Sequence, residues 1–199
     1  MKNGLVWTAL IIGLVEIYYR REFYFRYRYT FSKNTSTHPR QKRQSGGGGI
    51  MIWGMVMPNG LVSIKVIWGK QNSEKYIAML DSYIVPLMNL NMLPNYNFVQ
   101  DNCTVHVSGI AKEYFAKQSF QVLEWPSKSP DINIMENVWK MISNIVYEKD
   151  QPKNIKVLQE KIVSAVFHIN SEKLDVTQGL YHTFRQRLTR ILVSKGNLC

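Results

Sequence analysis

The stretch GIMIWGMVMPNGLVSIKVIW, residues 49–68, holds two apolar runs on either side of a turn sequence. Ile50–Met57 and Leu61–Trp68 are rich in the β-branched and aromatic residues that strands favour. Pro58, Asn59 and Gly60 between them are residues that build tight turns. Because so short a connection joins only antiparallel strands, residues 49–68 predict a β-hairpin. Strands in the neighbouring segments are expected to extend this hairpin into a larger sheet.

The residues before the hairpin carry further strand signals. Leu10–Val15 is a short apolar run, which predicts a buried strand. In Phe23–Phe31 five aromatic side chains recur at every second position, so they share one face of a half-buried strand, and Arg26 and Arg28 share the other. That basic face either meets phosphate or is solvated. Residues 32–49 are polar and end in four glycines, which predicts a loop.

After the hairpin, helices and short strands alternate. Asn72 or Ser73 is suited to cap the first helix, and Asp131 or Asn133 to start the helix that carries Glu136. The expected elements are a helix over Glu74–Met88, a strand over Asn97–Gln100, a helix near Ser108–Gln118, a strand over Gln121–Trp125, the helix that carries Glu136, and helices over Ile155–Ile169 and Tyr181–Ser194. An antiparallel three-strand start followed by parallel strands with helical crossovers predicts an α/β fold, a ribonuclease-H-like mixed sheet flanked by helices.

The size and charge of the chain limit its organisation and its partners. With 199 residues it can bury one core, so a single domain is expected. Residues 1–150 are expected to form the main body of that domain and residues 151–199 a helical extension of it. The net charge of +11 favours an anionic partner, nucleic acid before membrane. A basic protein that is merely soluble would carry the same charge.

The first residues also allow a different interpretation. Lys2 and the apolar run Gly4–Val15 have the form of a secretory leader, but no small-residue cleavage site follows. The run is shorter than the roughly 20 apolar residues of a membrane span. We therefore favour a strand and expect no membrane association. Cys103 and Cys199 show neither metal-ligand spacing nor a disulfide framework, which indicates a reducing, intracellular compartment.

Asp101 and Glu136 are the carboxylates best placed for chemistry. Asp101 follows a short apolar strand, at the carboxyl edge where open α/β sheets place their sites. Glu136 lies early on an amphipathic helix that can face the same edge. Two carboxylates that meet there need a divalent cation such as Mg²⁺, and a metal pair serves phosphodiester chemistry. From spacing alone, a turn acid at Asp101 and a solvated helix acid at Glu136 remain the favoured interpretation.

The residues around both acids carry a family resemblance. Gln100-Asp101-Asn102 followed by His106 resembles the QDN-x-x-x-H signature of Tc/mariner DNA transposases. Residues 129–139, SPDINIMENVW, resemble their SPDLNPIENLW motif, and the 34 residues between Asp101 and Glu136 match the D-34-E spacing of the Tc branch. In that family the two acids are the second and third of a triad that holds two Mg²⁺ or Mn²⁺ ions for DNA cleavage and strand transfer. The resemblance implies the same roles for Asp101 and Glu136.

Further motifs of the family follow in order over roughly residues 46–196. They are GGGIMIWG at 47–54, NSEKYI at 72–77, VLEWP at 122–126 and the terminal segment at 182–196. Two departures occur near the acids: Cys103, Thr104 and Val105 replace Ala-Pro-Cys, and Ile134 replaces a proline. Neither departure removes a metal ligand.

The first acid of the family is the exception. The family carries it in a strand of the form W-x-x-V-I-F-S-D-E-S. Here the apolar run Leu10–Val15 resembles that strand best with Val15 where the aspartate belongs, 86 positions before Asp101. Glu16 is adjacent but would lie on the opposite face of a strand, unless a one-residue bulge turns it inward. The resemblance therefore predicts a transposase domain whose catalysis is impaired or lost.

The remaining expectations concern accessory residues and partners. His106 either acts near the scissile phosphate or is structural, and Asn102 either orients Asp101 or a metal-bound water or is a plain turn residue. The predicted contacts to the DNA backbone are Arg26, Arg28, Arg40, Lys42, Arg43, Arg185 and Arg187.

The resemblance implies transposon-end DNA as partner, a homodimer or association with an intact transposase, and a nuclear location. The family's N-terminal helix-turn-helix units have no counterpart in this sequence, so a truncated copy is expected. A non-catalytic DNA- or protein-binding module on the same scaffold is the rival function.

Overall fold

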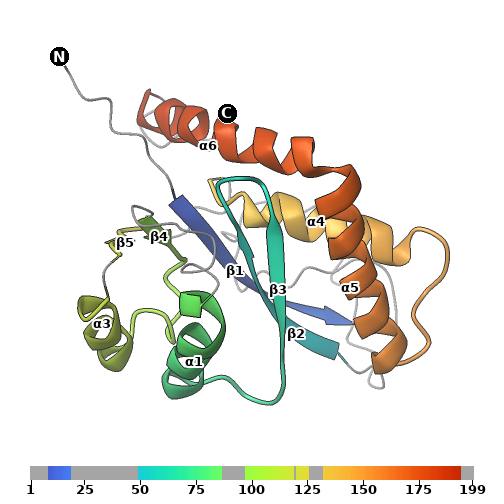
Figure 1. Ribbon diagram of the computed structural model, residues 1–199, viewed down its shortest axis with the longest axis horizontal. Helices are drawn as coiled ribbons and strands as arrows, with labels where there is room; N and C mark the ends of the chain where they lie inside the picture. Colours follow the sequence, from blue (N-terminus) through green and yellow to red (C-terminus); the bar gives the residue numbers. More distant parts are fainter. Residues whose placement is uncertain (1–8, 19–48, 87–96, 119, 126–131, 194–199) are drawn as a thin grey trace, which may run out of the picture.

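A five-stranded mixed sheet forms the centre of the molecule, whose computed structural model describes residues 9–18, 49–86, 97–118, 120–125 and 132–193 (Figure 1). The strand order is β3-β2-β1-β4-β5. The strands are β1 (Ala9–Tyr18), β2 (Gly49–Val56), β3 (Val62–Ile67), β4 (Asn97–Val99) and β5 (Val122–Leu123). β1, β2 and β3 are antiparallel, whereas β4 and β5 run parallel to β1. The antiparallel start and the parallel continuation agree with the prediction.

The predicted hairpin is confirmed. β2 and β3 pair from Met51 with Ile67 to Val56 with Val62. The turn is closed by backbone hydrogen bonds from Met57 N to Leu61 O and from Gly60 N to Met57 O, both of 2.8 Å. Gly60 has a φ of 84°, a conformation that a residue with a Cβ rarely adopts. The turn sequence therefore works as expected, and glycine is needed at its last position.

The helices follow the predicted order, with shifted ends. They are α1 (Ser73–Met79), its π-helical continuation η1 (Leu80–Ile84), α3 (Gly109–Ala116), α4 (Met135–Tyr147), α5 (Ile155–Glu172) and α6 (Leu174–Val193). Asn72, not Ser73, caps α1, since its side chain accepts a hydrogen bond from Lys75 N at 2.9 Å. At α4 the side chain of Asn133 accepts a bond from Met135 N at 3.0 Å, although Ile134 holds the capping position.

Two predicted boundaries were wrong. α6 starts at Leu174, seven residues before the expected Tyr181. Gly179 lies between these two positions and does not interrupt the helix. A glycine inside a helix costs about 1 kcal/mol, and burial of Thr177 and Phe184 on the same helix offsets it. β5 covers only Val122–Leu123 instead of 121–125. Tertiary packing thus decided where these elements end.

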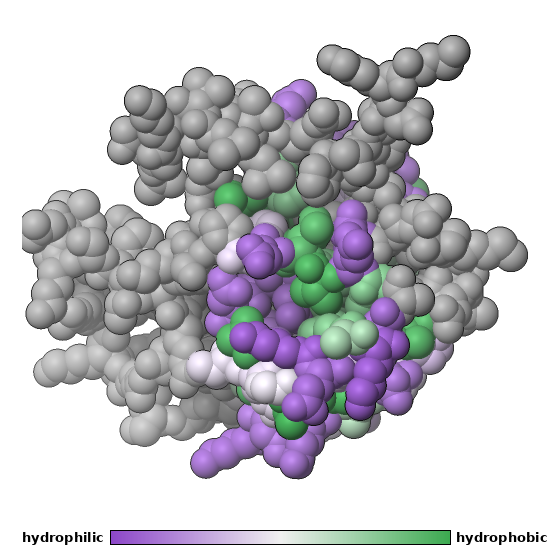
Figure 2. Space-filling view, turned by 90° about the vertical axis from the view of Figure 1, so that its left-hand side faces the viewer, coloured by the Kyte–Doolittle hydropathy of each residue, from purple (hydrophilic) through white to green (hydrophobic). Residues whose placement is uncertain are grey.

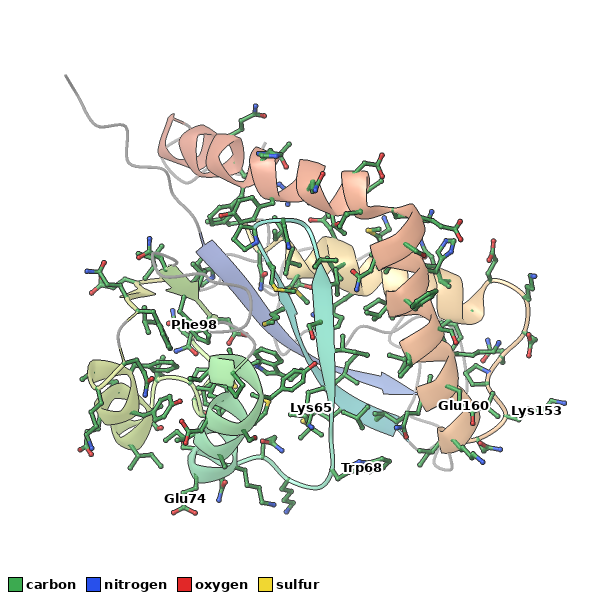
Figure 3. All side chains as sticks on the ribbon, viewed as in Figure 1. Lys65, Trp68, Glu74, Phe98, Lys153 and Glu160 are labelled. Carbon is green, nitrogen blue, oxygen red and sulfur yellow. The ribbon has the colours of Figure 1, made fainter. Side chains whose placement is uncertain are left out.

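The sheet separates two hydrophobic cores (Figure 1). The α4–α5 core contains Ile52, Val99 and Trp139, and the α1–α3 core contains Trp53 and Phe98. Neighbouring residues of β2 and of β4 therefore alternate between the two cores, as a strand requires. In Figure 3 the labelled Phe98 lies on the side of α1 and α3.

The surface of the described part is mixed. Figure 2 turns the left-hand side of Figure 1 to the viewer, and its hydrophobic and hydrophilic residues are interspersed. Val107 and Ile110 at the start of α3 are 38% and 43% exposed, and Trp68, which points outward beyond β3 in Figure 3, is 63% exposed. None of the helices in the described ranges is long and apolar enough to cross a membrane.

Several predictions lie outside the described residues. They are the strand over Phe23–Phe31, the loop up to residue 48, and the basic residues Arg26, Arg28, Arg40, Lys42 and Arg43. Asp131 and Cys199 also lie outside. These assignments stay predictions.

Candidate active site

Asp101 stands two residues beyond β4 and is held by its own loop. Its Oδ1 accepts a hydrogen bond from Cys103 N at 3.1 Å and lies 2.7 Å from Nδ1 of His106. The Asp101 side chain is 26% exposed, whereas that of His106 is 1% exposed. Within the described residues Oδ2 of Asp101 accepts no hydrogen bond. One oxygen is therefore fixed by the protein and the other is available to a ligand.

A buried network of ring contacts and hydrogen bonds holds His106 in place. The Tyr76 ring lies 4.4 Å from the His106 ring, centroid to centroid, and the Tyr76 hydroxyl donates to Oε1 of Gln100. Gln100 Nε2 in turn donates to the backbone carbonyl of His106 at 3.2 Å. Burial, and then the negative charge of Asp101, raises the pKa of Tyr76 well above 10, so the phenol stays a donor. The buried position and the bond to Asp101 favour the structural alternative for His106.

The electrostatics keep Asp101 ionised. Burial raises the pKa of its carboxyl, but the hydrogen bond and charge of His106 and the bond from Cys103 N lower it by more. The pKa therefore lies below its ordinary value of 3.8. An ionised carboxylate with one unshared oxygen is the form that a hard cation binds.

Glu136 occupies the first turn of α4, where the helix dipole favours an acidic side chain. Its Oε2 is inaccessible to solvent. Met135 beside it is fully buried in the α4–α5 core, and Val99, two residues before Asp101, lies in the same core. Met135 and Val99, which lie close to the acids in the sequence, are thus packed in one layer of side chains on the face of the sheet that α4 covers.

The strand that carries Val15 lies beside the strand that leads to Asp101. β1 pairs with β4 in parallel, from Ala9 with Asn97 to Ile11 with Val99. This adjacency is what the assignment of Val15 to the first acid requires, and the assignment itself stays a prediction. Val15 pairs with Ile52, a residue of the α4–α5 core, so its position belongs to the face of the sheet that α4 covers.

Glu16 holds a position of the other face. It pairs with Met51, which packs against the α1–α3 core. The pairing of β1 with β2 runs without a break from Ile11 to Tyr18. The register therefore contains no bulge that would turn Glu16 toward the face that α4 covers.

Three further contacts connect the residues that follow the acids. Asn102 Nδ2 donates to the carbonyl of Trp125 at 2.7 Å. Arg187 Nη1 donates to Oδ1 of Asn137 at 2.9 Å. This bond gives Arg187 an intramolecular partner, and its predicted contact to DNA stays a prediction, as does that of Arg185 on α6.

Tyr76, Gln100 and Asn137 contact the predicted site residues or their neighbours without having been predicted to do so. All three lie in the quoted motifs, so their motif positions were the available signal. The motif that contains Tyr76 does not indicate that its ring packs on His106, 30 positions later.

The comparisons with known proteins agree with this geometry. A family model described as DDE superfamily endonuclease matches residues 23–159. The chain belongs to this family. The Tc3 transposase of Caenorhabditis elegans is 30% identical over 157 residues, which are 78% of this chain and 47% of that protein. The Tcb1 transposase of Caenorhabditis briggsae is 27% identical over 153 residues, which are 76% of this chain and 54% of that protein.

These relatives make the chain a Tc/mariner DDE transposase domain, and it spans about half of their length. The catalytic domain of Mos1 mariner transposase has the same mixed α/β fold, with a TM-score of 0.73, 10% identity, and 99% of this chain and 86% of that chain covered. The Mos1 paired-end complex with Mg gives a TM-score of 0.76 at 12% identity, with 98% of this chain and 58% of that chain covered.

The predicted metal ligands Asp101 and Glu136 lie in the part of the chain that the family model matches. The family match includes Asp101 and Glu136 but begins after β1, so it does not include Val15. Within the described ranges no group of three His, Cys, Asp or Glu side chains is placed to hold a metal ion. The unshared carboxylate oxygen of Asp101 is a donor that suits a divalent cation, and the assignment of Asp101 and Glu136 as metal ligands stays a prediction.

Proposed function

We propose that this domain binds divalent cations through Asp101 and Glu136 next to DNA phosphates, and that its DNA cleavage and strand transfer are impaired. The observation that carries the proposal is the register of β1. It puts the apolar residue Val15 on the strand beside Asp101, on the face that α4 covers. With the first carboxylate missing, fewer negative ligands offset the repulsion between two close cations.

The expected cations are Mg²⁺ or Mn²⁺, which prefer carboxylate oxygens, and Mos1 complexes have been solved with each metal. When bound, such ions activate the attacking oxygen and stabilise the leaving oxygen of a phosphodiester. The protein's own part is orientation. His106 and Cys103 N hold one oxygen of Asp101 and leave the other for a cation. Loss of part of such a ligand set typically lowers catalysis by orders of magnitude.

The proposed partner is DNA. The chain carries a net charge of +11, which supports salt-sensitive contact to phosphates independent of sequence. Arg185, Arg187 and the basic residues between Arg26 and Arg43 are the proposed contacts. Mos1 complexes contain transposon ends in a paired-end arrangement, which supports transposon-end DNA and a second transposase chain as partners. A DNA substrate of this kind implies action in the nucleus.

Nicking of supercoiled plasmid DNA in Mg²⁺ or Mn²⁺ tests the impairment. We expect turnover at or near background for the native chain, and a clear increase for Val15→Asp, because this substitution supplies the missing carboxylate. Glu136→Gln in the Val15→Asp background is the control and should return the rate to background. Clear turnover by the native chain that Glu136→Gln abolishes would overturn the impairment.

The second possible outcome is that the domain binds DNA but does not cleave it. A gel-shift series over salt concentration, with and without Mg²⁺, measures it. Affinity that falls with salt, yet does not respond to Mg²⁺ or to Asp101→Ala, together with an inactive Val15→Asp variant, would replace the proposal by a non-catalytic DNA-binding module.

A further inference from the structure

Helix α6 contacts the residues that directly follow the two acids. From its side facing the core, Arg187 bonds to Asn137, the residue after Glu136. One turn earlier Phe184 stacks on Trp125, whose carbonyl accepts from Asn102, the residue after Asp101. We infer that α6 is a positioning element of the metal site, with Arg187 acting on Glu136 through Asn137. The inference rests on the proposed function of the two acids.

The contact at Arg187 restrains the start of α4. Arg187 and Asn137 are both half-buried, and the bond joins side chains 50 positions apart in the sequence. The capping position of α4, Ile134, has no capping side chain, and the N–H groups of Met135, Glu136 and Asn137 bond to Asn133 and to the carbonyl of Ile134. These bonds are local, and the tie from α6 adds the restraint that joins the first turn to a distant part of the chain.

The contact at Phe184 restrains the end of β4. The rings of Phe184 and Trp125 are nearly parallel, at 4°, with centroids 6.0 Å apart. Phe184 is 7% exposed and belongs to the α4–α5 core. The Asn102 bond of 2.7 Å to Trp125 then fixes the backbone next to Asp101. The bond to Trp125 supports the alternative in which Asn102 orients Asp101.

The other end of α6 is anchored to the hairpin turn. Gln178 Nε2 donates to the carbonyl of Asn59 at 3.0 Å. A Cβ on Gly60 would lie 2.6 Å from Cγ of Gln178, so the turn and the helix are in close contact. Figure 1 shows α6 running along the upper edge of the molecule past α4. Fixed at Gln178, the helix can transmit a constraint to residues 184 and 187.

Mn²⁺ binding without DNA tests the inference, measured by the loss of free-ion electron paramagnetic resonance signal. We expect Arg187→Ala and Asn137→Leu each to weaken Mn²⁺ binding about tenfold, as loss of partners behind metal ligands typically does. The double variant should be no weaker than either single variant, because both remove one bond. Asn137→Asp keeps an acceptor for Arg187 and should retain native affinity. Gln186→Ala, at the exposed neighbouring position, is the matched control.

Hydrogen exchange at the first turn of α4 supplies a readout that does not need the metal. Arg187→Ala should speed exchange at the amides of residues 136–138, and Gln186→Ala should not. Because no DNA is present, a lost phosphate contact cannot explain either effect. If Arg187→Ala and Asn137→Leu match Gln186→Ala in both measurements, the inference is wrong.

The two proposals fail in different ways. If Glu136→Gln abolishes Mn²⁺ binding while Arg187→Ala does not weaken it, the metal site stands and α6 has no positioning role. If neither Asp101→Asn nor Glu136→Gln weakens Mn²⁺ binding, the proposed metal site is wrong, and the positioning of a metal site by α6 falls with it.

Discussion

At the scale of single residues, the low pKa of the Asp101 carboxyl depends on His106. A carboxylate buried to this extent would have a raised pKa if it stood alone, and its usefulness as a ligand would fall. The His106 ring, itself held by Tyr76 and by Gln100, reverses that effect. His106, which the sequence marks only as a motif histidine, therefore lowers the pKa of the Asp101 carboxyl.

Replacement of His106 by leucine should raise the pKa of Asp101, because burial then acts without the opposing hydrogen bond. A carboxyl whose pKa is lowered in the folded state stabilises the protein above its ordinary pKa of 3.8, and that contribution is lost as pH falls through the folded value. The stability difference between native chain and variant should therefore narrow below that pH. NMR titration of the Asp101 carboxyl and urea unfolding at several pH values measure both effects. An unchanged pKa would contradict the assignment.

At the scale of elements, α4 lies very close to the sheet where β2 carries Gly54. A Cβ at this position would meet Cη2 of Trp139 at 2.3 Å and Cε of Met135 at 3.0 Å. Trp139 is 2% exposed and cannot move away easily. The glycine of the strand motif thus sets the distance between β2 and the helix that carries Glu136.

Gly54→Ala should lower the free energy of unfolding by about 1–3 kcal/mol, the usual cost of overpacking. Gly109→Ala is the control, because nothing lies within 4 Å of the added Cβ there, and it should change stability by less than about 1 kcal/mol. Urea denaturation of both variants measures the difference. Equal stability of the two variants would show that α4 adjusts at no cost.

At the scale of the whole molecule, the predicted C-terminal extension supplies part of the central packing. Leu158 and Ile162 of α5 are fully buried in the α4–α5 core, and Asn170 exchanges two hydrogen bonds with the backbone of Val62, of 2.9 and 2.8 Å. The division of the chain at residue 150 stays a prediction. These contacts indicate that residues after 150 unfold together with the sheet.

Leu158→Ala should destabilise the whole domain by about 2–5 kcal/mol. Val163→Ala on the same helix, at a side chain that is 53% exposed, should change stability by about 0.5 kcal/mol or less. Thermal unfolding followed by both circular dichroism and tryptophan fluorescence checks this. Two separate transitions, with only one shifted by Leu158→Ala, would show that α5 folds apart from the sheet.

Local pattern predicted much of the fold because strands, turns and caps depend on near neighbours. Short apolar runs predicted β2, β3 and β4, and Gly60 and Asn72 act where turn and cap chemistry predicted. The early start of α6 and the π-helical η1 were missed, since packing and not local preference decides them. The contact of Tyr76 with His106 and the bond of Arg187 to Asn137 were missed for the same reason.

The short ordered motifs around Asp101 and Glu136 were enough to predict the family, which the family match confirms, and to predict the two acids as metal ligands. The contacts that surround the two acids are visible only in the folded chain. The support for Asp101 comes from Tyr76 and the tie to α4 from Arg187, residues separated from their partners by 30 and 50 positions. Contacts over such separations form when the chain packs, and no local pattern specifies them.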